Sequence, residues 1–169
     1  MIDTPLVIGE PTTHTISVLV QNETGTINRL VSMFRRRGFS LASFNAGDCE
    51  DPGFSRITFV VNADGNELQQ VLRQLEKVID VVEVEDLKPG GHVGREVALI
   101  RLRPRDDQRR PIYDIVMRFG AKTPEATMRE MVVEYCGEPY KIEELIERLR
   151  SYEIVEIVRS GLVAIKVEG

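Results

Sequence analysis

The alternation of apolar and polar residues predicts the same folding unit twice along the chain. In the first half, short β-rich or alternating segments flank two stretches whose apolar residues recur every three or four positions. These helical stretches begin at Ile27 and Leu68, and each presents one apolar face. The predicted order is β-α-β-β-α-β, which is the order of a ferredoxin-like unit. Its strands are predicted at residues 15–21, 39–48, 54–62 and 80–87.

The second half repeats this pattern. Helical periods begin at Ile112 and Ile142, and Pro111 stands where the first residue of a helix would be. Strands are predicted at residues 96–103, 121–126 and 128–136, with a terminal hairpin of 153–159 and 162–167.

The repeat is visible in the residues as well as in the pattern. DVVEV, which starts at Asp80, resembles EIVEI, which starts at Glu153, at an offset of 73 residues. The same offset aligns Leu72 with Leu145. The fold class is therefore predicted to be α+β, with two ferredoxin-like domains. Such open sheets have exposed edges, which are commonly hidden by pairing, so a dimer is expected.

Turn residues divide the chain into segments. Lys88-Pro89-Gly90-Gly91 is the only strong interior linker signal. The prediction is a loose N-terminal arm over residues 1–14, a first domain over 15–88, a linker over 89–95 and a second domain over 96–169.

Composition excludes several classes of function. The formal charge of −5 does not favour a nucleic-acid binder, whose surface is basic. With two His and two Cys, a four-ligand zinc site would need all of them, and a nucleophile–His pair has few candidates, so neither a metal site nor a catalytic site is predicted. No membrane span and no signal peptide are expected, and Cys49 and Cys136 are predicted to be reduced thiols. The expected location is the cytoplasm.

Charged clusters are predicted to be solvated rather than functional. Arg35–Arg37 close a helix, where cations complement the dipole. The arginines between Arg101 and Arg110 are interrupted by acids, so they indicate a solvated or partner-binding loop. The surface interpretation is also preferred for both histidines, His14 and His92, and for four acidic residues: Glu143, Glu144, Glu147 and Glu153.

One segment carries binding chemistry. Asn22-Glu23-Thr24-Gly25-Thr26-Ile27 connects the first strand to a helix. Gly25 permits a close approach of the backbone, and the N–H groups of Gly25 and Thr26 would suit a carboxylate. Asn22 offers a donor and an acceptor, as an amino-acid zwitterion requires. No nucleophile or base accompanies them. A plain turn capped by Thr24 explains the spacing equally well.

Residues 15–87 resemble an ACT domain, a small-molecule sensor of amino-acid metabolism. The resemblance narrows to the acetohydroxyacid (acetolactate) synthase small subunit, the regulatory partner of a thiamine-diphosphate enzyme, and extends from Thr15 to Val167. The segments that carry it are SVLVQNETGTINRLVSMFRRRGFSLASFNAG, DPGFSRITFVV, HVGREVALIRL and IVEIVRSG.

The resemblance implies an effector site where two ACT domains meet across a homodimer. The matching positions are Asn22, Gly25, Thr26, Ser40 and Leu41, with Thr24, Ile27 and Asn28 close by. Many members have Asn where this chain has Ser40. The single hydroxyl implies fewer hydrogen bonds to the ligand, and each lost bond to a charged group costs about 1.5–3 kcal/mol.

The resemblance also implies a function. This chain would be non-catalytic, would raise the activity of the catalytic large subunit, and would confer feedback inhibition by a branched-chain amino acid, most often valine. It would carry no cofactor, because thiamine diphosphate, FAD and Mg are expected on the large subunit. The second domain would help dimerisation and contact with the large subunit. The alternative is a free-standing ACT-type binding or assembly module without a synthase partner.

Overall fold

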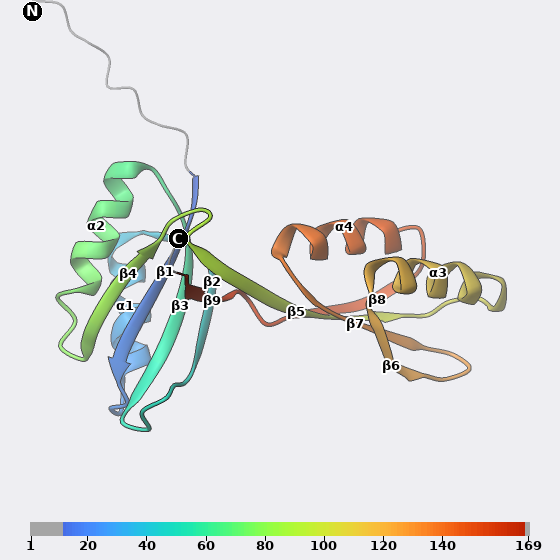
Figure 1. The fold of residues 1–169 in the computed structure, drawn as a ribbon, viewed down its shortest axis with the longest axis horizontal. Coiled ribbons are helices and arrows are strands. Elements are labelled where there is room, and N and C mark those ends of the chain that lie inside the picture. The colour runs from blue at the N-terminus through green and yellow to red at the C-terminus, as the bar shows by residue number, and fades with distance from the viewer. Residues whose placement is uncertain (1–11, 168–169) are drawn as a thin grey trace, which may run out of the picture. The chain divides into compact units, whose positions relative to one another are not determined.

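The computed structural model describes residues 12–167, which divide into two compact units (Figure 1). Of the described residues, the N-terminal unit comprises 12–93 together with 164–167, and the C-terminal unit comprises Gly94–Val163. Both divisions fall inside strands. Each unit is described by itself below.

The N-terminal unit is a four-stranded antiparallel sheet with two helices. The strand order is β2-β3-β1-β4, which places β1 and β3 in the centre of the sheet, where they pair along their whole length. Its elements are β1 (Thr12–Gln21), α1 (Thr26–Arg37), β2 (Ser40–Asp48), β3 (Phe54–Ala63), α2 (Gly65–Leu75) and β4 (Val81–Leu87).

Alternation along the central strands builds the core of this unit. Every second residue of β1 from Ile16 to Val20 is buried against the helices, which contribute Leu30, Phe34 and Val71 among others. Helix α2 starts with a capping box in which Asp64 accepts hydrogen bonds from Asn66 N and Glu67 N, both at 2.8 Å.

The C-terminal unit repeats this topology. Its strand order is β6-β7-β5-β8, the same path as in the first sheet, and the prediction of two ferredoxin-like units is confirmed. The elements are β5 (His92–Leu102), η1 (Asp106–Gln108), α3 (Arg109–Phe119), β6 (Lys122–Ala126), β7 (Met131–Gly137), α4 (Pro139–Leu149) and β8 (Ile154–Arg159). Its core includes Ile100, Ile112 and Leu145, all fully buried. Strand β9 (Val163–Lys166) follows β8, and all but its first residue belong to the N-terminal unit.

The prediction of a terminal hairpin is wrong. Strands β8 and β9 each pair with β5, and not with one another. Ser160 N donates to Val97 O at 3.0 Å, and Val167 N donates to Gly91 O at 3.0 Å, so the chain continues along β5. The reason is length: β5 has 11 residues and β8 only 6, which leaves part of the edge of β5 for β9.

Two predicted boundaries also differ from the structure. Strand β1 begins at Thr12, so the last part of the predicted arm 1–14 is strand, while residues 1–11 lie outside the described part. Strand β5 begins at His92, inside the predicted linker 89–95. Across residues 12–167, no helix is long and apolar enough to cross a membrane.

Candidate functional site

The loop between β1 and α1 has the geometry of a ligand-binding turn. Gly25 is the N-cap of α1 and has φ 89°, a left-handed conformation that a residue with a Cβ adopts only at a cost. No side chain caps the helix, so the alternative of a turn capped by Thr24 is wrong. Asn22 N donates to Gly53 O at 2.9 Å, which ties this loop to the β2–β3 turn.

Thr26 holds the loop from inside. It is buried, and its hydroxyl donates to Glu23 O at 2.9 Å, with a longer contact to Gln21 O. Its backbone N–H also donates to Glu23 O, at 3.2 Å, so it is not free for a ligand as predicted. Within residues 12–167, the N–H of Gly25 has no hydrogen-bond partner and can donate a hydrogen bond to an anion.

Arg29 adds a positive charge to the loop that sequence reasoning missed. Its Nε lies 2.5 Å from Oδ2 of Asp80, a carboxylate whose side chain is 7% exposed. Its Nη2 lies 3.4 Å from Thr24 O, and its Nη1 would be 3.2 Å from a Cβ on Gly25. A cation in the first helical turn opposes the helix dipole, and that placement was a signal for a role other than helix stability.

A shallow pocket of about 150 Å³ lies at this loop. Below about 300 Å³ a pocket is smaller than those that take drug-sized ligands, so this one fits only a small molecule or part of one. Thr24 and Asn28 lie beside it without lining it. Its lining combines loop residues with apolar side chains of the sheet: Val20, Gln21, Asn22, Glu23, Gly25, Thr26, Ile27, Ser55 and Ile57.

Ser40 and Leu41 lie at the other end of the same unit. Ser40 pairs with Asn62 of β3, whereas Gln21, next to the loop, pairs with Phe54. Eight residues of β3 separate these positions, which corresponds to about 26 Å at ~3.3 Å per residue. Ser40 lines a separate pocket of about 70 Å³. One copy of the chain therefore does not bring the two groups of predicted effector residues together.

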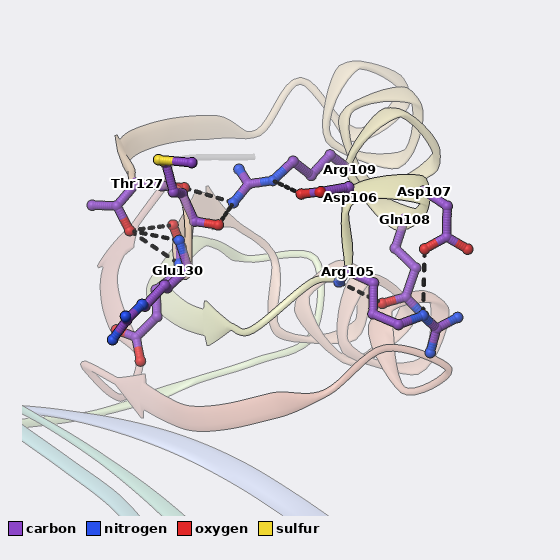
Figure 2. Close-up of polar contacts among 9 residues, drawn as sticks. Arg105, Asp106, Asp107, Gln108, Arg109, Thr127 and Glu130 are labelled. Carbon is purple, nitrogen blue, oxygen red and sulfur yellow. Dashed lines mark hydrogen bonds and ion pairs between the residues drawn. The ribbon is translucent and has the colours of Figure 1, made fainter.

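The arginine-rich loop of the C-terminal unit is held by internal contacts. Figure 2 shows Arg109 reaching Thr127, and its Nη2 lies 2.6 Å from the carbonyl oxygens of Thr127 and Met128. Arg105 Nε lies 3.3 Å from Asp107 Oδ1. Hydrogen bonding to Glu130 raises the pKa of Arg103. These contacts make the loop a structural element and leave few of its charges for a partner.

The other sequence candidates lie on the surface or in local contacts. His14 contacts Thr12 and the carbonyl of Ala63, and His92 contacts the carbonyl of Lys88. Cys49 and Cys136 are free. Within residues 12–167, no group of three His, Cys, Asp or Glu could hold a metal ion. The helix acids are exposed and paired with arginines: Glu143 with Arg159, Glu144 with Arg148, and Glu147 with Arg150.

Comparison with known proteins identifies both units. Residues 16–83 match the family described as the acetohydroxyacid synthase small subunit-like ACT domain, and residues 95–168 match the small subunit of acetolactate synthase. The acetolactate synthase small subunit of Mycolicibacterium smegmatis is 38% identical over 93% of this chain and 92% of its own length. This chain belongs to the acetolactate synthase small-subunit family.

Further members of the small-subunit family agree with this assignment. The acetolactate synthase small subunit of Bacillus subtilis is 39% identical over 88% of this chain and 87% of its own length. The crystal structure of the small subunit from Thermotoga maritima superposes with a TM-score of 0.87 at 32% identity, covering 94% of this chain and 99% of that one. The ACT domain and the small-subunit identity support a regulatory role beside a catalytic large subunit.

Proposed function

We propose that this chain activates the catalytic subunit of acetolactate synthase and makes it sensitive to a branched-chain amino acid, most often valine. The observation that carries the proposal is the β1–α1 loop, where the left-handed Gly25 exposes backbone beside a fixed cation, Arg29. The loop offers binding groups without a nucleophile or base, which suits a sensor. Thiamine diphosphate, FAD and Mg are accordingly proposed for the large subunit.

The chemistry of the loop fits a small amino acid. A carboxylate would meet the N–H of Gly25 and the guanidinium of Arg29 at the positive end of α1. Asn22, with an amide oxygen, suits the ammonium group. A branched aliphatic side chain would contact the apolar part of the lining, which Val20 and Ile57 supply.

A homodimer would unite the two separated groups of residues. Strand β2 is the edge of its sheet and starts at Ser40. If two copies paired antiparallel through β2, Ser40 and Leu41 of one copy would lie at the same end of the joint sheet as Asn22 and Gly25 of the other. The small volume of the loop pocket is what a half-site completed by a second copy would have.

Regulation then requires only that the effector prefers one quaternary arrangement. A coupling free energy of about 1–3 kcal/mol between effector binding and catalytic-subunit activity is typical. The direct experiment reconstitutes the large subunit with and without this chain and adds valine, leucine or isoleucine. We expect activation by the chain and inhibition by at least one of the three. No complex and no change in rate would favour the free-standing ACT module instead.

Gly25→Asp tests the loop itself. The new carboxylate would occupy the close-approach space and repel the effector carboxylate, so we expect inhibition to disappear while activation and the dimer persist. Gly90→Asp is the matched control, because Gly90 also has a positive φ, 76°, and has open space around it. Equal loss of inhibition in both variants would show that the loop is not the effector site.

Ser40→Asn tests the contribution of the residue that the second copy would bring to the effector site. The longer amide would restore a hydrogen bond to the charged effector, and about a tenfold lower inhibitory concentration is expected. An unchanged concentration would place Ser40 outside the effector site.

A further inference from the structure

The C-terminal unit contains a second and larger cavity that the proposed effector site does not use. It lies between α3, α4 and β7 and has a volume of about 610 Å³, within the ~300–1,000 Å³ range of small-molecule sites. Helix α3 contributes Ile115, Arg118 and Phe119, which are spaced to share one face.

The cavity is positively charged although the chain is acidic. Arg118, Lys141 and Arg148 line it together with a single carboxylate, Glu144, so the lining side chains carry an excess of two positive charges in a chain of formal charge −5. Lys141 is also paired, at 3.4 Å, with Glu138, which does not line the cavity. The contact of Arg148 with Glu144 is loose, at 3.8 Å. Arg118 has no ion pair or hydrogen bond with any residue from 12 to 167. An anion would offset the repulsion among these cations.

Two aromatic side chains also line the cavity, Tyr135 from β7 and Phe119 from α3. The ring of Tyr135 lies across Gly137 so closely that a Cβ there would be 2.5 Å from Cε1. The same ring meets Phe119 edge to face, with centroids 6.2 Å apart and an interplanar angle of 88°. Gly137 thus makes room for Tyr135, and the two rings form an apolar surface beside Arg118 and Ile115.

We propose that this cavity binds an organic anion, in which a phosphoryl or carboxylate group is carried on an aromatic or apolar body. The anionic group would contact Arg118 and Arg148, whose guanidinium groups suit the geometry of either oxyanion. The apolar body would pack on Tyr135 and Phe119. This ligand differs from the amino acid proposed for the β1–α1 loop, because the cavity has an excess of cations and only one carboxylate for an ammonium group.

Calorimetric titration of the full chain with four probes tests the site. Phenyl phosphate and benzoate carry both features, inorganic phosphate carries only the charge, and phenol carries only the ring. We expect saturable binding of phenyl phosphate or benzoate with a Kd below about 1 mM, and at least tenfold weaker binding of inorganic phosphate and phenol. The stronger of the first two identifies the anionic group. Failure of both to saturate overturns the proposal.

Variants then locate the binding. Arg118→Ala is expected to weaken the binding of the tighter-binding probe about tenfold. Arg110→Ala removes the same charge from the same helix but outside the cavity, so it should leave the affinity for that probe unchanged. Tyr135→Leu should weaken the binding of phenyl phosphate and leave the binding of inorganic phosphate unaffected. Equal effects of Arg118→Ala and Arg110→Ala would reduce the binding to general electrostatic attraction and refute a site in this cavity. Effector inhibition by valine is measured in parallel, and its loss or retention bears only on the loop site.

Discussion

The two units share a topology, yet their first loops differ in length and in the contacts that hold them. In the N-terminal unit only Asn22–Gly25 separate β1 from α1, and the turn closes on a left-handed glycine. In the C-terminal unit the corresponding connection is longer, contains η1, and uses its arginines for internal contacts. One topology thus carries a short loop with a left-handed glycine in the N-terminal unit and a longer loop held by internal contacts in the C-terminal unit, because loop geometry depends on the local residues and not on strand order.

A difference in core burial between equivalent helices gives the largest expected effect. Leu145 is fully buried, whereas Leu72, at the equivalent position 73 residues earlier, is partly exposed. Leu145→Ala should lower the free energy of unfolding by about 2–5 kcal/mol, and Leu72→Ala by less. All four tyrosines lie at positions 113–152, so tyrosine fluorescence in urea reports the C-terminal unit. A larger cost for Leu72→Ala, measured by hydrogen exchange in β1 and β3, would contradict the comparison.

Each unit also contains a nearly buried carboxylate paired with an arginine. Arg159 contacts Glu96 through two nitrogens, at 2.9 and 2.8 Å, and only 7% of the Glu96 side chain is exposed. Arg29 contacts Asp80 through one nitrogen and is 43% exposed.

Replacing these arginines by the similarly sized Met sharpens the comparison. Arg159→Met should destabilise the C-terminal unit by about 1.5–3 kcal/mol, because it leaves Glu96 without its donors. Arg29→Met should cost no more than the lower end of that range, since Asp80 loses one hydrogen bond from its arginine whereas Glu96 loses two. Urea unfolding followed by hydrogen exchange in each unit measures both. A larger loss for Arg29→Met would show that Asp80 depends on its arginine more than Glu96 does.

The starts of the second helices differ more subtly. Asp64 caps α2 through its side chain, whereas Glu138 stands before Pro139 at the start of α4 and makes no such cap. Asp64→Ala should cost about 1 kcal/mol and Glu138→Ala less than half of that, as measured by thermal unfolding. Equal shifts in Tm would mean that the capping box contributes nothing beyond the backbone.

The smallest expected effect is the pH response of Glu138. A hydrogen bond from Tyr140, assisted by Lys141, lowers the pKa of Glu138. Because the folded pKa lies below the unfolded one, the associated stability is present at neutral pH and is lost as the pH falls through the folded pKa. Carboxyl NMR titration should show this low pKa in the wild type and a higher value in Tyr140→Phe. An identical value in both would exclude the hydrogen bond as the cause.

Most elements could be predicted because their signals are local. The apolar spacing from Ile27 and from Ile142 places residues on one helix face, and that face must be buried whatever the neighbours are. The terminal hairpin could not be predicted correctly, because whether β9 pairs with β8 or with β5 depends on the free edge left by a strand about 60 residues earlier in the chain. The role of Arg29 was missed for the same reason, since it depends on Asp80, 51 residues away.

The sequence by itself determined that the chain is a duplicated β-α-β-β-α-β protein and that Gly25 opens a loop at a helix start, because periodicity and glycine act within a few residues. Tertiary structure alone decided how charges are matched. It placed Arg29 on a buried carboxylate beside that loop, brought Arg109 to the carbonyls of Thr127 and Met128, and left Arg118 unpaired in the cavity that Tyr135 also lines, among the described residues. Such pairings depend on distances between elements that no local pattern specifies.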